Sequence, residues 1–473
     1  MKVLYAVSEA TPFIATGGLA DVGGSLPPAL RKRRTACRAV LPLYKGIGQD
    51  FREKMQFVTD FVVPLAWRRQ YCGVFRLNHE GAVYYFLDNE YYFKRDGLYG
   101  HYDDAERFAF FSRAVMELIK HIDFKPDIIH CNDWQTAMIP VYNTILYSKL
   151  PGYENIKTVF TIHNIQYQGV YDKSLMGEVL DLDEDYFSLL EYGGAVNLMK
   201  GGIECADMVS TVSPTYANEI LDPWYSHGLD PILRERAYKL RGILNGIDFK
   251  AYDPGNDSDI FFPYSAKDKS GKAKNKAALQ EHLGLELKAD LPLIGITTRL
   301  VTHKGLDLVV EAFENILASS QAQFAILGSG DYAFEEFFHA MAEKYPGRVS
   351  FTAGFIPHLA RKIYAGVDLF LMPSKSEPCG LSQMVSLRYG TLPIVRETGG
   401  LKDSVTDSGD GKGNGFTFKS YNFADMTDAV NRALTAFYDK AAWGKLVDRA
   451  LKDDNSWANS AGEYLEMYRG ILS

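Results

Sequence analysis

The sequence predicts an α/β protein made of two blocks, each with a parallel, doubly wound sheet. Short β-rich runs alternate with amphipathic helical patterns along most of the 473 residues, and such alternation is typical of parallel sheets covered by helices. The length exceeds what one ordinary hydrophobic core holds, which favours two or three domains. A polar stretch near residues 248–290 separates the blocks and indicates a domain boundary.

The first block alternates in this way from the N-terminus to the boundary. The segment Ala105–Ile122 has the pattern of an amphipathic helix. Strands are expected at residues 2–8, 37–43, 82–87, 126–131, 157–162, 207–212 and 242–245.

The second block repeats the alternation with compact apolar runs. Two such blocks predict two Rossmann-like halves. Strands are expected at residues 292–297, 323–327, 349–353, 367–372, 392–395 and 415–418, with helices near 305–318, 333–345, 358–366, 380–389 and 424–438.

The polar stretch between the blocks is rich in charged residues. It contains Asp257-Ser258-Asp259 and the lysine-rich run Lys267–Lys276. We expect it to be an exposed connection or a peripheral insertion.

Charge and cysteine content narrow the class of protein. The net charge is -8 without a long basic block, which argues against a nucleic-acid partner. The one basic run, Arg31–Arg34, suits a solvated helix C-terminus. Five scattered cysteines favour reduced thiols over disulfides or a zinc site. With neither a secretory signal nor an apolar run of about 18 residues, we expect a cytoplasmic protein.

Ligands of doubly wound proteins bind at the carboxyl ends of the strands, and two facing sheets would place the site in the cleft between them. The first motif there is Thr16–Val22, which follows the first predicted strand. Paired Gly17 and Gly18 permit positive φ and close approach of amides to a ligand, and a helix start there would suit phosphate. For a lone glycine pair, however, a plain tight turn is the favoured explanation. No G-x-G-x-x-G pattern follows a strand, which lowers a nicotinamide-dependent interpretation.

The second motif, Thr297–Gly305, leaves the first strand of the second block. Arg299 offers a planar fork for phosphate oxygens and Lys304 a mobile positive charge, a pair suited to a diphosphate leaving group. A solvated surface is the competing interpretation.

The third motif, Pro373–Ser382, follows another buried strand. Pro378 suits the first turn of a helix, whose free amides would then point at an anion. Glu377 would either cap that helix or face the positive charge that develops on a sugar ring during transfer.

Two further motifs, at residues 130–135 and 161–169, end strands of the first block. His163 is flanked by Asn164 and two glutamines, a density of hydrogen-bonding groups that sugar hydroxyls require. Asp133 stands beside Trp134, a pair suited to a hydroxyl and a ring face. Each signal has a structural explanation, but all five motifs fall at strand ends.

These motifs resemble the bacterial glycogen synthase and plant starch synthase family nearly end to end. The resemblance rests on K-V-L-Y-A-V-S-E, T-G-G-L-A-D-V, H-C-N-D-W-Q-T, T-I-H-N-I-Q-Y-Q-G, E-P-C-G-L-S-Q and R-Y-G-T-L-P-I-V-R-E-T-G-G-L. It implies a GT-B fold, with two Rossmann-like domains facing a deep cleft. It also implies a retaining glucosyltransferase that moves glucose from ADP-glucose to the non-reducing end of an α-1,4-glucan such as glycogen, with no metal and no cofactor.

The resemblance also implies the domains and the roles of individual residues. It implies an acceptor-side domain at 1–247, a donor-side domain at 248–455 and a terminal helix at 456–473 that crosses back to the first domain. Glu377 and His163 are implied as catalytic. Donor binding is implied for Arg299, Lys304, Gly18, Asp21, Asn245, Gly354, Phe355, Cys379, Gly380 and Leu381, and sugar or acceptor binding for Asp133, Asn164 and Glu9.

One departure affects the first motif. Family members commonly have lysine where this chain has Ala15, and that lysine is linked to donor or acceptor engagement. The change bears on donor affinity and on the preference for ADP-glucose over UDP-glucose. It leaves two alternatives, a GT-B transferase with another donor or acceptor and a glucan-binding homologue without catalysis. A glucan phosphorylase fits less well because no motif for a pyridoxal phosphate lysine is present.

Overall fold

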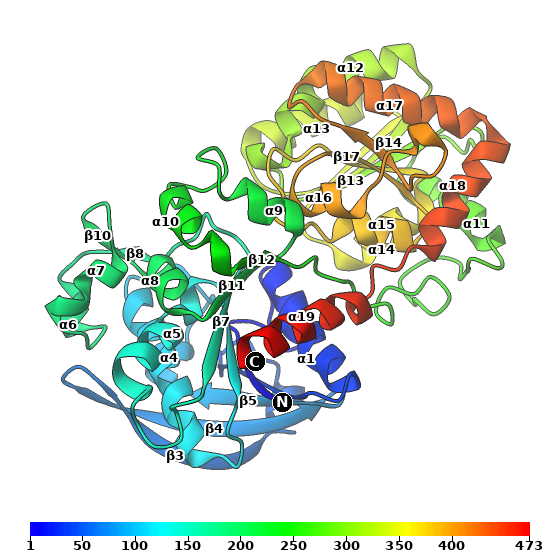
Figure 1. Ribbon diagram of the computed structural model, residues 1–473. Coiled ribbons are helices and arrows are strands. Elements are labelled where there is room, and N and C mark those ends of the chain that lie inside the picture. Colours follow the sequence, from blue (N-terminus) through cyan, green and yellow to red (C-terminus); the bar gives the residue numbers. More distant parts are fainter. The chain divides into compact units, whose positions relative to one another are not determined.

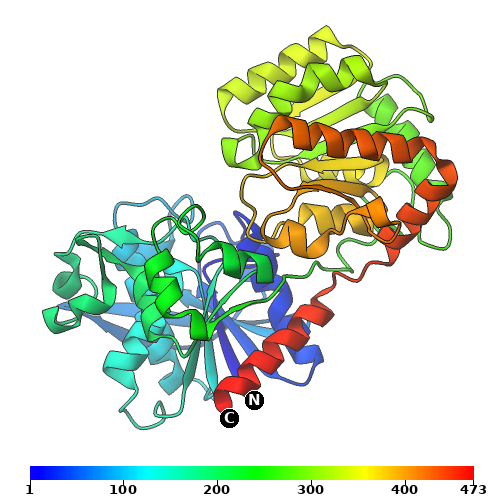
Figure 2. The ribbon, with the colours of Figure 1, turned by 45° about the horizontal axis from the view of Figure 1, so that its top comes forward.

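The computed structural model describes residues 1–473 except for the side chain of Asp410. The chain forms two compact units (Figures 1 and 2). The first contains Met1–Asn245 and Trp457–Ser473, and the second contains Gly246–Ser456. The unit limits therefore fall within two residues of the expected domain limits at 248 and 456.

The first unit is built on a nine-stranded sheet with the order β12-β11-β7-β6-β1-β2-β5-β4-β3. Seven strands are parallel, and each overlaps one of the predicted runs. They are β1 (Lys2–Ala6), β2 (Ala36–Pro42), β5 (Ala82–Asp88), β6 (Ile128–Asn132), β7 (Lys157–Ile162), β11 (Met208–Thr211) and β12 (Leu240–Gly242).

The prediction missed the two strands at one edge of this sheet. β3 (Gln56–Leu65) and β4 (Arg68–His79) form an antiparallel hairpin that adds to β5. Buried and exposed residues mix along both strands, so neither has the compact apolar run that identified the buried strands. A small separate sheet, β8 (Val170–Tyr171), β10 (Ala195–Asn197) and β9 (Glu191–Tyr192), was also missed.

Helix α1 (Gly18–Lys32) contains two prolines in its interior. Pro27 and Pro28 have no N–H, so the carbonyls of Gly23 and Gly24 lose their helical partners. The buried Tyr84 hydroxyl donates toward both carbonyls, at 3.5 and 3.2 Å. A side chain from β5 thus supplies one donor that the two carbonyls share, and it ties α1 to the sheet.

The C-terminal helix α19 (Trp457–Leu472) lies beside α1 in the first unit (Figure 1). Arg33 Nη2 donates to the Ala458 carbonyl at 2.6 Å. Tyr468 OH lies 2.6 Å from Nδ1 of His130, whose Nε2 lies 2.6 Å from Thr161 Oγ1. The end of the chain thereby completes a buried hydrogen-bond network in the unit where the chain begins.

The second unit has a six-stranded parallel sheet in the order β15-β14-β13-β16-β17-β18. All six strands overlap predicted runs: β13 (Leu293–Thr297), β14 (Gln323–Gly328), β15 (Val349–Ala353), β16 (Leu369–Met372), β17 (Leu392–Arg396) and β18 (Phe416–Phe418). Covering helices include α12 (Leu306–Ser319), α13 (Tyr332–Lys344), α14 (Pro357–Gly366) and α17 (Phe423–Tyr438).

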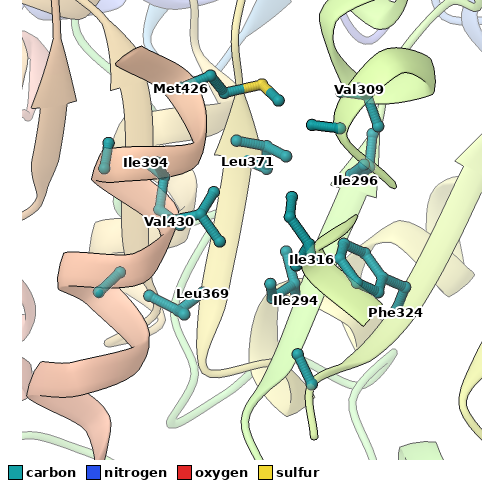
Figure 3. Packing of buried hydrophobic residues seen from close by; sticks show 14 of the residues in the cluster. Ile294, Ile296, Val309, Ile316, Phe324, Leu369, Leu371, Ile394, Met426 and Val430 are labelled. Atoms are coloured by element: carbon teal, nitrogen blue, oxygen red, sulfur yellow. The ribbon is translucent and has the colours of Figure 1, made fainter. Parts of the chain in front are cut away.

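The core of this unit lies between the sheet and the helices α12 and α17 (Figure 3). Aliphatic side chains from both helices pack on the strands, as the apolar faces of amphipathic helices require. The residues labelled in the figure are Ile294, Ile296, Val309, Ile316, Phe324, Leu369, Leu371, Ile394, Met426 and Val430.

The stretch 248–290, expected as an exposed connection or a peripheral insertion, is a structured part of the second unit with many exposed residues. This stretch contains α11 (Ser270–His282), which packs against α14. Asn275 is fully buried and donates to the Phe262 carbonyl at 2.6 Å. The Lys272 ammonium lies within 3.2 Å of the Ala365 and Val367 carbonyls. Polar side chains in this stretch thus donate hydrogen bonds to backbone carbonyls inside the unit. A polar composition by itself does not predict such contacts.

All five cysteines are free thiols. Among the helices that the structure describes, none combines the length and hydrophobicity that a membrane span requires.

Candidate active site

In the first unit, polar side chains gather where β1, β6 and β7 end. These strands are neighbours in the sheet, so the loops that follow them meet at one edge. Glu9, Asp133 and His163 come from these three loops. Asp133 Oδ1 accepts hydrogen bonds from the amides of His163, at 2.7 Å, and Asn164, at 3.4 Å. The structure therefore brings the predicted Asp133, His163 and Asn164 into direct contact.

Asp133 has an unusual backbone, with φ 55° and ψ 179°. Non-glycine residues rarely adopt this region, which costs about 1–3 kcal/mol and is often found at functional sites. Hydrogen bonds hold it in place, since its amide donates to the Thr161 carbonyl at 2.9 Å and its carbonyl accepts from the Thr136 amide at 3.1 Å. Burial, helped by the nearby charge of Glu9, raises the pKa of Asp133 to about 7.

His163 is held in one tautomer by Asn132. The Asn132 amide nitrogen donates to the Ala6 carbonyl at 2.9 Å, so its Oδ1 faces Tyr5 OH, at 2.9 Å, and His163 Nε2, at 2.8 Å. Because Oδ1 only accepts, Nε2 carries the proton. Burial lowers the pKa of His163 to about 3. The ring is therefore neutral, and its Nδ1 presents a lone pair.

Glu9 is buried after β1 and anchors the loop that precedes α1. Its carboxylate accepts from the Thr16 amide and from Thr16 Oγ1, the latter at 2.9 and 3.0 Å. Tyr99 OH donates to Glu9 Oε1 at 3.3 Å. Burial raises the pKa of Glu9. Tyr99 and Asn132 could not be predicted from the sequence, because neither contact can be inferred without knowing which strands are neighbours.

The backbone of the glycine pair at the start of α1 does not have the expected conformation at Gly17. Gly17 has φ -167°, which is extended backbone, so the expected positive φ is absent at that residue. A Cβ at Gly17 would meet no atom within 4 Å. Gly18 is the first residue of α1, and Asp21 lies in its first turn. The open space beside Gly17 is compatible with a ligand that approaches the backbone.

In the second unit, an ion pair joins the loops after β13 and β16. Lys304 Nζ lies 2.6 Å from Glu377 Oε2, and Ser374 Oγ donates to the same oxygen at 3.1 Å. Glu377 is 7% exposed, and a buried carboxylate of this kind requires such partners. Gly305 makes the approach possible, since it has φ 76° and a Cβ there would lie 2.0 Å from the Pro373 carbonyl oxygen.

The expected helix start after Glu377 was wrong. Helix α15 spans Ser382–Arg388, so Pro378 and the three residues after it precede the helix. Gly380 has φ 68° and turns the chain. Gln383 Nε2 donates to the carbonyls of Cys379, at 3.2 Å, and Gly380, at 2.9 Å. The loop 377–381 is thus fixed by a side chain of α15.

Gly399 and Gly400, which belong to the motif R-E-T-G-G-L, pack against the backbone of this loop. Gly399 has φ 44°, and a Cβ there would lie 1.9 Å from the Glu377 carbonyl oxygen. A Cβ at Gly400 would lie 2.1 Å from the Cys379 carbonyl oxygen. The Gly400 amide donates to the Pro378 carbonyl at 3.1 Å. The glycine pair therefore sets the position of the Glu377 backbone.

The remaining predicted residues lie at strand ends without direct contact to these groups. Arg299 is exposed in the loop after β13. Gly354, with φ 130°, and Phe355, 90% exposed, follow β15. Asn245 is buried at the end of the first unit, and its Oδ1 has no hydrogen-bond partner among the described residues.

Comparison with known proteins decides the family. Residues 2–235 match the model of the starch synthase catalytic domain, and residues 281–454 match the model of glycosyl transferases group 1. The chain is 49% identical to the glycogen synthase of Exiguobacterium sibiricum, with 100% of this chain and 99% of the relative covered. The chain belongs to the glycogen and starch synthase family. The glycogen synthase of Geobacillus stearothermophilus is 48% identical, with 100% and 98% covered.

Solved structures place the family on the GT-B fold. The catalytic domain of starch synthase IV from Arabidopsis thaliana, bound to ADP and acarbose, matches with a TM-score of 0.91 and 34% identity, covering 100% of this chain and 99% of that one. Sucrose-phosphate synthase from Thermosynechococcus elongatus matches with a TM-score of 0.63 and 17% identity, covering 100% and 99%, a likeness of fold alone. The predicted family and fold are confirmed.

Proposed function

We propose that this glycogen synthase family member transfers glucose from ADP-glucose to the non-reducing end of an α-1,4-glucan, with retention at the anomeric carbon. The observation that carries the proposal is similarity over the full length to glycogen synthases. The ion pair of Lys304 with Glu377 supports it, because a transfer from a diphosphate sugar uses both a cation and an anion at the reacting bond.

Donor binding is assigned to the second unit, residues 248–455 in the predicted limits. Arg299 and Lys304 would hold the diphosphate, because a planar guanidinium and a mobile ammonium suit its oxygens. Amides of the fixed loop at Cys379, Gly380 and Leu381 would assist. ADP is bound in the similar starch synthase IV structure, which supports an adenine nucleotide here.

Contacts to the nucleotide are assigned to exposed residues at strand ends. The mostly exposed Phe355 ring, which follows Gly354, would stack on the base. Gly18, Asp21 and Asn245 would complete donor binding from the first unit.

The transfer breaks the bond between glucose C1 and the diphosphate oxygen and forms a bond from C1 to the acceptor O4. The acceptor hydroxyl proton passes to the leaving phosphate oxygen, on the same face of the sugar. Glu377 would stabilise the positive charge at C1 during this exchange. Lys304 holds the carboxylate in place and would also face the negative charge that builds on the phosphate.

Sugar and acceptor recognition is assigned to the first unit, residues 1–247. The lone pair of His163 Nδ1 would accept a hydrogen bond from a glucose hydroxyl. Asp133 and Asn164 would bind further hydroxyls, and Glu9 would contribute to the same sugar-binding or acceptor-binding region. The preset tautomer and the fixed Asp133 backbone favour recognition without reorganisation.

Donor competition tests the proposal and addresses Ala15. The protein would be given equal ADP-glucose and UDP-glucose, one of them labelled in the glucose, with glycogen as acceptor. We expect incorporation mainly from ADP-glucose, with a donor KM above that of a relative that has lysine at this position. The Ala15→Lys variant should lower this KM. Preferred use of UDP-glucose would contradict the donor assignment, and glycogen binding without incorporation from either donor would favour the non-catalytic alternative.

A further inference from the structure

A shallow hollow lies in the first unit, apart from the residues assigned above. Its volume is about 330 Å³, at the lower end of the range for small-molecule sites. It is lined by Trp67, Arg68, Arg69, Gln70, Tyr91 and Glu106.

The register of the sheet places this hollow at a definite edge. β4 is antiparallel to β5, and their last pair joins Gly73 to Asp88, so residues 68–72 extend beyond the carboxyl end of β5. Helix α3 (Glu90–Phe93) follows β5 at that end. The carboxyl ends of β1 and β6 lie on the same edge. β4 is three strands from β1 in the sheet order, or roughly 14 Å at the usual strand spacing.

Two aromatic rings stand at the surface of the hollow. Trp67 is 73% exposed and Tyr91 is 60% exposed. Trp67 lies in the two-residue turn between β3 and β4, where Ala66 has φ 51°. The guanidinium of Arg68 lies 4.4 Å from the Trp67 ring centroid, and that of Arg95 lies 5.4 Å from the Tyr91 ring centroid. Both rings are thus held in position while most of their area remains open to a ligand.

Two charged side chains that line the hollow are also held in place. Arg68 Nη2 lies 2.8 Å from Glu106 Oε2, and Tyr92 OH donates to Glu106 Oε1 at 2.5 Å. Arg68 Nη1 donates to the Glu178 carbonyl at 2.5 Å. The side chains of Arg68 and Glu106 are only 14% and 16% exposed. Arg69 and Gln70 add further planar hydrogen-bonding groups at the rim.

We propose that this hollow is a second binding site for the α-glucan chain. A pyranose ring has apolar C–H faces that pack on aromatic rings and a rim of hydroxyls that both donate and accept. The hollow offers that combination, because two exposed rings and the fixed planar groups of Arg68 and Glu106 line it together. The pairing of Arg68 with Glu106 leaves Arg69 as the single unbalanced charge of the lining, so the hollow suits a neutral polyhydroxylated ligand better than an anion or an apolar surface.

The site would raise the affinity for a polymer rather than for a short acceptor. A glycogen particle presents many chains, so a second contact makes the first one effectively intramolecular. This inference rests on the proposed function for its choice of ligand, but binding at the hollow needs no turnover.

The test uses the full-length protein and two variants, Trp67→Ala and Tyr91→Ala, which remove mostly exposed rings. Tyr238→Ala is the matched control, because Tyr238 is 81% exposed on the far side of the strand order, next to β12. Retardation in native gels that contain glycogen reports binding, and kinetics with glycogen and with maltotriose report its effect on turnover. Trp67→Phe tests whether a ring restores binding.

We expect Trp67→Ala and Tyr91→Ala each to weaken glycogen retardation roughly two- to tenfold, the range of one aromatic contact. The KM for glycogen should rise more than the KM for maltotriose, Trp67→Phe should recover most of the loss, and Tyr238→Ala should match the wild type. Unchanged retardation in both ring variants would overturn the second site. Weaker retardation of the variants together with a wild type that incorporates no glucose would uphold the second site and refute the proposed function.

Discussion

The protonation state of His163 follows from its surroundings rather than from its residue type. Asn132 Oδ1 accepts from Nε2, and burial lowers the pKa of the ring to about 3. The ring therefore acts as a hydrogen-bond acceptor at Nδ1 over the whole physiological range. In the proposed transfer, a neutral ring would not oppose the positive charge that develops on the sugar.

The first prediction concerns this ring. Its Cε1–H resonance should not titrate between pH 5 and 8. In Asn132→Asp, a carboxylate faces the ring, and the pKa should rise so that the resonance titrates in that range. Proton NMR of protein labelled at histidine measures both. A wild-type His163 that titrates near pH 6.5 would contradict the account.

The second prediction concerns Asp133, whose pKa is raised to about 7 by burial. The folded protein keeps a proton that the unfolded chain releases near pH 4, so ionisation of Asp133 lowers stability as pH rises from about 4 to 7. Asp133→Asn should remove this loss. The free energy of unfolding of the variant minus that of the wild type should therefore increase over this pH interval and level off above it.

Measuring urea unfolding at several pH values checks the prediction. The buried histidines contribute equally to both proteins and cancel in the difference. Parallel stability curves from pH 4 to 8 would show that folding does not raise the pKa of Asp133.

At the scale of elements, tight backbone contacts position the loops that carry Lys304 and Glu377. Gly399 and Gly400 allow the start of α16 (Gly399–Ser404) to touch the backbone of residues 377–379. Gly305 does the same for the loop that carries Lys304. The Glu377 loop is thus placed by two glycines that come later in the chain, and the Lys304 loop by the glycine that directly follows Lys304.

The third prediction follows from the contact at Gly399. In Gly399→Ala, the new Cβ meets the Glu377 carbonyl oxygen and φ is positive, so the Glu377 loop must move. We expect at least a tenfold fall in kcat, because catalytic groups tolerate little displacement. Gly444→Ala in α18 (Lys440–Lys452), where a Cβ meets no atom within 4 Å, should keep full activity. Equal activity of both variants would show that Gly399 does not position the Glu377 loop for activity.

Buried strands of both sheets could be predicted from the sequence because parallel strands that are covered on both faces are continuous apolar runs. The β3–β4 hairpin could not, since its residues alternate irregularly between core and solvent. The helix start at α15 was placed too early because Pro378 fits a first turn as well as an irregular loop. Local preference left this choice open, and the contacts of Gln383 decided it.

In the candidate site, contacts between residues that are far apart in the chain could not be predicted from the sequence. Strand ends identified Lys304 and Glu377 separately, but their ion pair depends on β13 and β16 being neighbours. The role of Asn132 depends in the same way on β1, β6 and β7 lying side by side. Strand order is a property of the folded sheet, so residue types predict candidates and the topology assigns their partners.

At the scale of the whole molecule, the chain leaves the first unit at Asn245 and returns to it at Trp457. The second unit is therefore one continuous segment with its own core. The first unit needs both ends of the chain, because Tyr468 completes the buried hydrogen bonds of His130.

The fourth prediction follows from this arrangement. Residues 246–456 expressed alone should fold with a cooperative thermal transition. Deletion of 457–473 from the full chain should destabilise the first unit by several kcal/mol, since it exposes apolar surface and leaves a buried imidazole short of a partner. Calorimetry of both proteins measures this. A truncated chain as stable as the wild type would show that α19 is dispensable.

The most direct test of the central claim is the rate at which labelled glucose passes from ADP-glucose into glycogen when Glu377 is replaced by glutamine. This change removes the charge and keeps the shape, so we expect kcat to fall at least roughly a hundredfold, as for loss of one transition-state electrostatic contact. Glu336→Gln, at an exposed position of α13, should match the wild type. Incorporation by Glu377→Gln within a few-fold of the wild-type rate would contradict the account.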